Sequence, residues 1–124
     1  MMKRYVMLGS ISAGLSVALG AFGAHMLEGI LTPERMATYE TAVQYHMSHA
    51  LALLLIALLA DRLKDQTKVL WAARLIWIGT IIFSGSLYLL CFTGVGMLGA
   101  ITPIGGVAFI AGWIMLAMAA RRSA

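Results

Sequence analysis

Charged side chains are scarce in this sequence of 124 residues: Asp, Glu, Lys and Arg together make up 11% of it, and 61% is hydrophobic. A soluble domain averages about 25% charged and about 45–50% apolar residues. The scarcity excludes a disordered chain, a basic nucleic-acid-binding domain and an ordinary water-soluble globule. An integral membrane protein remains. At this length we expect a single membrane domain, residues 1–124, which contacts membrane lipids and has no nucleic-acid partner.

Cysteines and recognisable catalytic motifs are also missing or nearly so. Cys91 is the single cysteine, so no disulfide framework or CxxC metal site can form within one chain. The sequence has no HExxH motif, no phosphate-binding glycine loop, no dinucleotide fingerprint and no Ser–His–Asp arrangement. We therefore predict a protein that is not an enzyme and that holds no cofactor.

The sequence contains long apolar stretches instead of such motifs. A helix needs about 20 apolar residues to cross about 30 Å of hydrocarbon. Four segments meet this requirement: 5–27, 39–60, 69–92 and 100–120. Their short connections make sequence neighbours antiparallel, and helices satisfy every backbone polar group internally, as lipid requires. The predicted fold is all-α: an integral membrane, antiparallel four-helix bundle.

Basic residues are concentrated at one end of this bundle. Lysine and arginine occur before the first span, between the second and third spans and after the fourth, whereas the opposite end has only Arg35 beside Glu28, Glu34 and Glu40. Basic residues accumulate on the cytoplasmic side of membrane proteins. The distribution therefore predicts that both termini are cytoplasmic.

Two Thr-Pro pairs are typical of helix N-termini. A threonine hydroxyl caps a free N–H at the start of a helix, and proline at the first position has no N–H to leave unsatisfied. Thr32-Pro33 predicts a helix that begins at Pro33, ahead of the apolar part of the second span. Thr102-Pro103 repeats the pattern and predicts a helix start within the fourth span.

Small residues recur at helical spacing in three of the spans. Helices in lipid associate through close packing of such residues, because hydrophobic burial does not distinguish a helix from an acyl chain. We interpret them as packing positions within the bundle, with a homo-oligomer interface as the alternative. The positions are Ser12, Ser16, Gly20, Ala24, Ser84, Gly85, Ser86, Gly105 and Gly106.

The second span carries polar residues where they are costly. Its residues 50–60 are apolar but cover only about 16 Å, so the polar half must also be embedded. An ionisable group there costs about 2.5–3.5 kcal/mol and usually faces protein or a wet cavity. Helical spacing places Glu40 and Gln44 on one face and His46 and His49 on roughly the opposite one. The predicted polar intramembrane cluster is His25, Glu40, Gln44, Tyr45, His49 and Tyr88.

Three functions are compatible with these features. The absence of catalytic motifs favours an accessory, assembly or lipid-contacting subunit, in a homo-oligomer or a larger membrane complex. A transporter or channel component is the alternative, because Glu40, Gln44 and the histidines could line a proton path and histidine titrates near pH 6.5. A haem or quinone redox subunit is the second alternative. His46 and His49 are weak metal-ligand candidates; further ligands are missing, so no metal is predicted.

Several short motifs resemble one known family along most of the chain. They are the segment 20–25 (GAFGAH), Tyr45, the segment 49–51 (HAL), the segment 83–88 (FSGSLY), the segment 102–106 (TPIGG) and the segment 111–113 (AGW). The sequence resembles the domain-of-unknown-function 423 family, small bacterial inner-membrane proteins similar to eukaryotic transmembrane protein 256. The resemblance implies a four-span, multi-pass protein of the bacterial inner membrane and implies no reaction.

Overall fold

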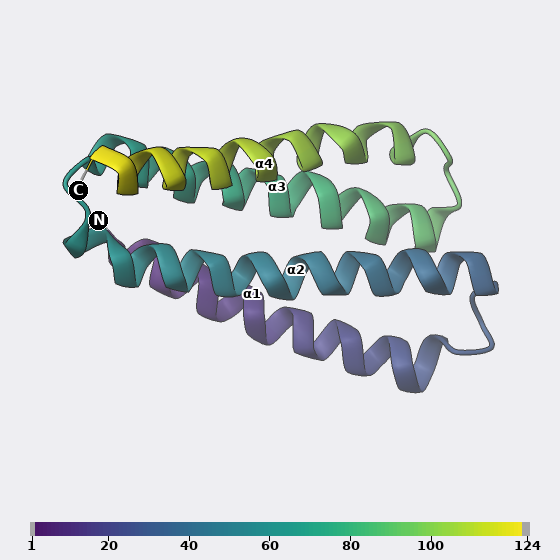
Figure 1. Ribbon diagram of the computed structural model, residues 1–124. Coiled ribbons are helices and arrows are strands. Elements are labelled where there is room, and N and C mark those ends of the chain that lie inside the picture. Colours follow the sequence, from purple (N-terminus) through teal and green to yellow (C-terminus); the bar gives the residue numbers. More distant parts are fainter. Residues whose placement is uncertain (1, 123–124) are drawn as a thin grey trace.

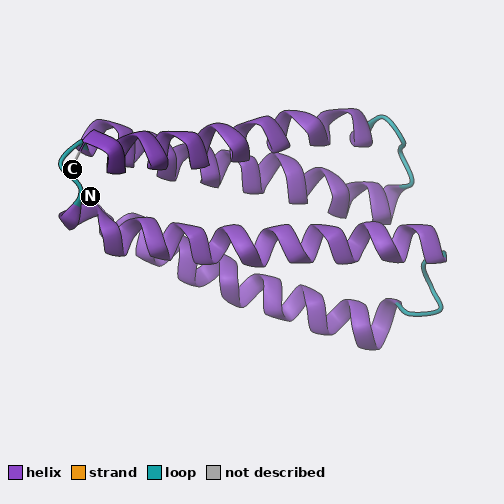
Figure 2. Cartoon of the chain, in the orientation of Figure 1, coloured by secondary structure: helices purple, strands orange, loops and turns teal. Residues whose placement is uncertain are grey.

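The computed structural model describes residues 2–122, the side chain of Arg122 excepted; residues 1, 123 and 124 of the predicted domain lie outside the described part. Four long helices follow one another: α1 (Met2–Phe22), α2 (Pro33–Leu59), α3 (Gln66–Thr93) and α4 (Leu98–Arg122). A π-helical turn, η1 (Gly23–Leu27), extends α1, and a 3-10 turn, η2 (Ala60–Arg62), extends α2. The described residues form no strand (Figure 2), which confirms the all-α fold.

The four helices are long enough and apolar enough to cross a membrane. They run antiparallel, so α1 begins and α4 ends at the same end of the bundle (Figure 1). We call the opposite end, with the connections 28–32 and 94–97, the distal end. Large apolar side chains cover the outer surface, as on α4, where Ile101, Ile104, Val107, Ile110 and Ile114 are exposed. The four-helix membrane bundle is confirmed, and the side of the membrane that the distal end faces stays a prediction.

Packing follows the order of the chain. The principal helix pairs are α1–α2, α2–α3 and α3–α4, and Figure 1 shows the α3–α4 pair above the α1–α2 pair. The largest buried cluster lies toward the end that holds the termini and is apolar throughout, with Leu53, Ile56, Val69 and Ile76 fully buried. Because α1 packs chiefly on α2, the side of α1 that is turned toward α3 stays accessible.

Glycines allow α3 and α4 to approach most closely. A Cβ atom built on Gly105 would lie 2.4 Å from the backbone nitrogen of Phe83, and one on Gly79 would lie 2.5 Å from the ring of Phe109. One on Gly112 would lie 3.2 Å from a backbone carbonyl of α3. Real Cβ atoms essentially never lie within 3.0 Å of another atom, so Gly79 and Gly105 limit the distance between the two helices, and the approach at Gly112 is tighter than most real Cβ contacts.

The other predicted packing positions of α3 and α4 have different surroundings. Ser84 and Ser86 are buried between helices. Gly106 is less confined, since a Cβ there would meet Phe83 at 3.9 Å, an ordinary contact. Gly85 faces open space, with no atom within 4 Å of where a Cβ atom would lie. Gly105 and Gly106 are therefore adjacent in sequence but differ in their surroundings: a side chain has no room at Gly105 and can be accommodated at Gly106.

On α1 the predicted row of small residues turns away from α2 at its end. Ser12 and Ser16 are buried and Gly20 is half-buried, but Ala24 is exposed. Each four-residue step advances a side chain by about 40° around a helix of 3.6 residues per turn, so Ala24 has rotated about 120° from Ser12. Gly23 occupies the interface instead, where a Cβ atom would clash with the ring of Tyr39.

The two Thr-Pro pairs differ in the structure. Thr32 caps α2, because its hydroxyl oxygen accepts a hydrogen bond from the N–H of Arg35, and the helix begins at Pro33 as predicted. The predicted start at Thr102-Pro103 is wrong: α4 begins at Leu98 and contains Pro103. The hydroxyl of Thr102 instead donates to the carbonyl of Leu98 and pairs with the hydroxyl of Ser86 on α3. It therefore contributes to the contact between α3 and α4.

The helices also extend beyond the predicted spans 5–27, 39–60, 69–92 and 100–120. The spans are delimited by apolar residues, whereas the helices continue through the polar residues that flank them. α2 gains six residues at its start, and α3 begins three residues early, at a cap formed by the carboxylate of Asp65. The first predicted span ends as η1, which is π-helical and not α-helical.

Candidate functional site in the distal half of the bundle

Helix α2 separates its polar residues onto two faces. His46 and His49 are 5% and 6% exposed, and both point into the bundle. Glu40, Gln44 and Ser48 are exposed on the other face. The division follows from the turn of 100° per residue, and it gives α2 one buried polar surface and one that faces outward.

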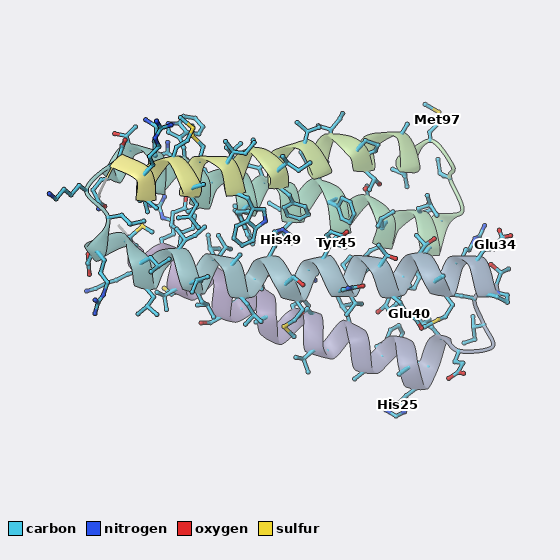
Figure 3. All side chains as sticks on the ribbon, viewed as in Figure 1. His25, Glu34, Glu40, Tyr45, His49 and Met97 are labelled. Carbon is cyan, nitrogen blue, oxygen red and sulfur yellow. The ribbon has the colours of Figure 1, made fainter. Side chains whose placement is uncertain are left out.

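His49 lies between α2 and α4. Its Nδ1 is 2.9 Å from the carbonyl oxygen of Tyr45, and its Nε2 accepts a hydrogen bond from the indole N–H of Trp113 at 3.1 Å. The imidazole stacks on Phe109, with 3.6 Å between ring centroids, and is nearly parallel to the ring of Tyr45. Figure 3 shows His49 and Tyr45 directed from α2 toward the α3–α4 pair. Every polar atom of the ring thus has a partner.

His46 connects three helices. Its Nδ1 is 2.9 Å from the hydroxyl of Tyr88 on α3, and its Nε2 is 2.9 Å from the hydroxyl of Ser12 on α1. Hydroxyl groups can donate or accept, so the arrangement suits either tautomer of the ring. We call these residues the Ser12–His46–Tyr88 triad. It joins α1, α2 and α3 in a single hydrogen-bonded chain.

Two further polar contacts tie the helices together at the same level. Ser84 of α3 donates to the carbonyl of Ala42 on α2 at 2.8 Å. Ser86 of α3 and Thr102 of α4 have their hydroxyl oxygens 2.5 Å apart. In lipid a polar group without a partner is costly, so these bonds favour this helix arrangement over others in which the same groups would face acyl chains.

The structure brings together only part of the predicted cluster. Tyr88 contacts His46, and Tyr45 contacts His49 and packs on Phe83, with 4.6 Å between ring centroids. His25, Glu40 and Gln44 are exposed and take no part in these contacts. Figure 3 shows His25 in η1, pointing away from the bundle at the distal end, and Glu40 on the side of α2 that is turned toward α1 and away from the α3–α4 pair.

The helical arrangement explains why His25 is separate from the histidines of α2. η1 is π-helical and packs on α2 through its two buried residues, Gly23 and Leu27. His25 lies between them in sequence and is exposed. The sequence-based prediction groups residues that lie at similar depths in the membrane. Whether their side chains meet depends also on the rotation of each helix about its axis.

Two contributors to the site have other roles in the sequence-based prediction. Ser12 is predicted as a packing residue, and Trp113 as part of a family motif; the structure makes them partners of His46 and His49. Residue type gives a usable signal, because buried imidazole needs hydrogen-bonding neighbours and both serine and tryptophan can supply them. The choice of partner depends on helix rotation, which the sequence pattern leaves open.

His46 and His49 do not form a shared metal site. Each ring has its own pair of partners, on different helices. Within residues 2–122 no group of three or more His, Cys, Asp or Glu side chains is arranged to hold a metal ion. The arrangement of these rings serves hydrogen bonding between helices.

Fold and site together define a small integral membrane protein whose four helices are joined by buried polar contacts. Residues 19–106 match the family described as "Protein of unknown function (DUF423)". The chain is 52% identical to the UPF0382 membrane protein YwdK of Bacillus subtilis (strain 168), over 96% of this chain and 97% of that protein. It is 48% identical to the UPF0382 membrane protein SH2409 of Staphylococcus haemolyticus (strain JCSC1435), over 93% of each chain.

The chain therefore belongs to the DUF423 family, which confirms the resemblance seen in its motifs. The names of these relatives specify a membrane protein and no activity. No solved structure matches the chain. Any function beyond membership of a membrane-protein family has to be argued from the site itself.

Proposed function

We propose that this protein is a non-enzymatic subunit of an assembly in the bacterial inner membrane, and that it assembles through the outward-facing polar surface of α2. The observation that carries the proposal is the position of Gln44. Its side chain is exposed, yet it lies about 24 Å along α2 from Ala60, inside a hydrocarbon layer of about 30 Å. A primary amide at that depth needs a hydrogen-bonding partner.

The neighbouring polar residues on this surface have less need than Gln44 of a hydrogen-bonding partner from another molecule. Ser48 donates to the carbonyl of Gln44 at 2.8 Å, which satisfies its hydroxyl proton. Glu40 lies about 30 Å from Ala60 along α2, at the edge of the hydrocarbon layer where head groups and water reach it. Gln44 is therefore the residue whose exposure to acyl chains is least favourable.

A groove beside Gln44 suits close approach by another helix. It has a volume of about 260 Å³ and runs between α1 and α2, where Gly20 and Ala24 on one wall face Glu40 and Gln44 on the other. Small residues let helix backbones approach each other in lipid. An amide group both donates and accepts, so Gln44 can pair with its own copy across a two-fold axis. We therefore assign the groove to a second copy of this chain.

The core favours a subunit over a conducting pore. Beyond His49 toward the termini, the buried residues of α2 are Ala50, Ala52, Leu53 and Ile56, all apolar. A proton path needs continuous polar groups or water, and the buried polar contacts stop near the middle of the bundle. The polar residues are placed to hold helices together.

Cross-linking in native membranes tests the assembly. In a Cys91→Ser background, Gln44→Cys is expected to form a disulfide-linked dimer on mild oxidation. Ile104→Cys, on the exposed face of α4, is the matched control and is expected to stay monomeric. Gln44→Leu should also lower the dimer fraction in a bilayer, measured by single-molecule photobleaching.

The outcomes separate the parts of the proposal. Equal cross-linking at positions 44 and 104, with no effect of Gln44→Leu, would reject the α2 surface as an interface. Cross-linking of position 44 to a different membrane protein would reject the second copy and retain a subunit role. A catalytic turnover found for the purified protein would reject the non-enzymatic assignment.

A further inference from the structure

A slot lies between α1 and α3, and His46 of α2 forms part of its lining. It is accessible because α1 packs chiefly on α2 and leaves its side toward α3 uncovered. The apolar wall residues Ile11, Leu15 and Ile81 are exposed, so a molecule dissolved in the bilayer can enter from the side. On α2 the side chains of His46 and Gln44 point about 160° apart, so the slot and the proposed α2 interface are separate.

The polar part of the slot lies deep in the membrane. Nε2 of His46 is 2.9 Å from the hydroxyl of Ser12, and the backbone of His46 is about 21 Å along α2 from Ala60. On α1, Gly9 precedes Ser12 by less than one turn. A Cβ atom on Gly9 would lie 3.0 Å from the carbonyl oxygen of Ala50, which is about 15 Å along α2 from Ala60. The contact between Ser12 and His46 therefore lies about 15–21 Å into a hydrocarbon layer of about 30 Å. The ester carbonyls of phospholipids lie at the boundaries of that layer and do not reach it.

The triad of Ser12, His46 and Tyr88 has one hydroxyl proton more than its internal hydrogen bonds use. Neutral imidazole and the two hydroxyls carry three protons. Two hydrogen bonds join the three side chains, and each uses one proton. Neither hydroxyl has a second partner among the described residues. Whichever tautomer His46 adopts, one hydroxyl proton remains for an acceptor outside the triad.

The other polar side chains of the slot indicate the same kind of ligand. The hydroxyls of Thr80 and Ser84 donate to backbone carbonyls of α3 and α2, so their protons are used. Trp77 also lines the slot, and its indole N–H has no acceptor within the described part of the chain. The bilayer core holds no water to accept these protons. The slot thus offers two donors, and a ligand that satisfies them must carry acceptors.

An isoprenoid quinone combines such acceptors with solubility in the bilayer core. Its ring is uncharged and carries two carbonyl acceptors and no donor, and its tail is hydrocarbon. No charged head group holds it at the boundary, so its ring can reach the depth of the triad. Ligand pockets typically have apolar and aromatic walls with a few placed polar groups, and Trp77 with the aliphatic wall residues beside the triad has this composition.

We propose that the α1–α3 slot binds the ring of an isoprenoid quinone, and that a ring carbonyl accepts the remaining hydroxyl proton of the Ser12–His46–Tyr88 triad. The isoprenoid tail leaves the slot between α1 and α3 and lies among the acyl chains. The site binds the oxidised form, and no electron transfer is assigned to it. It is independent of the α2 surface, so quinone binding can be lost without a change in dimer fraction.

Two ligands that differ only in their carbonyls test the hydrogen bond. Delipidated protein in mild detergent is mixed with equal amounts of a prenylated naphthoquinone and of the prenylated naphthalene that lacks both carbonyl oxygens, and bound ligand is counted by native mass spectrometry. One naphthoquinone per chain is expected, favoured over the naphthalene by roughly 2- to 10-fold, the range for one net hydrogen bond. Equal binding of the two would overturn the role of the triad. An excess of phosphatidylglycerol should leave the naphthoquinone bound, and its displacement would overturn the choice of ligand.

Two glycine substitutions test the position of the site. Gly85 lines the slot, Gly14 lies elsewhere on the surface of α1, and no atom lies within 4 Å of an added Cβ at either position. Gly85→Leu is expected to lower naphthoquinone binding by about 5-fold or more, because its side chain occupies the slot. Gly14→Leu should leave binding unchanged. Equal binding by both variants would show that the ligand lies elsewhere.

Two tryptophan substitutions separate the triad from the indole. Trp77→Phe removes the N–H and keeps an aromatic ring, so the preference for naphthoquinone over naphthalene should persist, because the triad still supplies a donor. Trp71 is exposed and does not line the slot, so Trp71→Phe is the control and should bind both ligands as the wild-type protein does. Loss of the preference in Trp77→Phe alone would assign the hydrogen bond to the indole instead of the triad.

Discussion

The indole N–H of Trp113 on α4 donates to Nε2 of His49 on α2 across 3.1 Å. Tryptophan has a donor and no acceptor, so Nε2 carries no proton and the proton of the ring is on Nδ1. Nδ1 then donates to the carbonyl of Tyr45 at 2.9 Å. The contact fixes one neutral tautomer of a histidine near the middle of the bundle.

Removal of this donor should destabilise the protein. Trp113→Phe leaves a buried acceptor without a partner, which costs about 1–3 kcal/mol. Trp71→Phe is the control: Trp71 is exposed, and the Arg74 guanidinium lies 5.2 Å from the centroid of its ring, so a change within about 0.5 kcal/mol is expected. Reversible unfolding in bicelles measures both variants.

A double-mutant cycle separates the hydrogen bond from lost packing. His49→Phe removes the acceptor and keeps a ring against Phe109. The double variant with Trp113→Phe should be more stable than the sum of the two single losses by about 0.5 kcal/mol or more. Strict additivity would show that the two residues are not coupled.

Gly105 and Gly106 should respond in opposite ways to one methyl group. Gly105→Ala places a Cβ atom 2.4 Å from the backbone of Phe83, which cannot move without moving α3. We expect a loss of about 1–3 kcal/mol from overpacking. Gly106→Ala makes only a 3.9 Å contact and should be neutral or slightly stabilising, since alanine favours helix by up to about 1 kcal/mol. Equal effects on unfolding would contradict the α3–α4 geometry.

The number and order of the helices can be predicted from the sequence because a lipid environment restricts the possible backbone structures. A long apolar stretch must be helical there, and short connections make neighbours antiparallel. The burial of His46 and His49 opposite Glu40 and Gln44 also follows from helical spacing. Which helix each histidine meets depends on the rotation of α1, α3 and α4 about their axes.

Local sequence patterns fail where tertiary contact determines the outcome. Thr102-Pro103 has the composition of a helix start, but the hydroxyl of Thr102 pairs with Ser86 and α4 begins earlier. Ala24 continues a four-residue spacing, but a helix does not repeat every four residues, and Gly23 takes its place. Both differences arise from packing between helices.

Two glycines with positive φ provide a test of the two connections at the distal end. Gly94 has φ of 72° and ends α3, and Gly29 has φ of 88°. Alanine at either position costs about 1–2 kcal/mol for the left-handed conformation. Gly94→Ala should cost more, because its Cβ atom would also lie 2.5 Å from the Arg35 guanidinium. An unfolding free energy that is equally reduced in both variants would show that Arg35 moves freely.

The predicted orientation leads to an asymmetric labelling pattern. Met97 lies in the α3–α4 connection at the distal end and is 80% exposed, and Arg62 is exposed at the opposite end. In a Cys91→Ser background, Met97→Cys should react with a membrane-impermeant maleimide in intact cells. Arg62→Cys should react only after lysis, because basic residues mark the cytoplasmic side. Labelling at position 62 in intact cells would reverse the orientation.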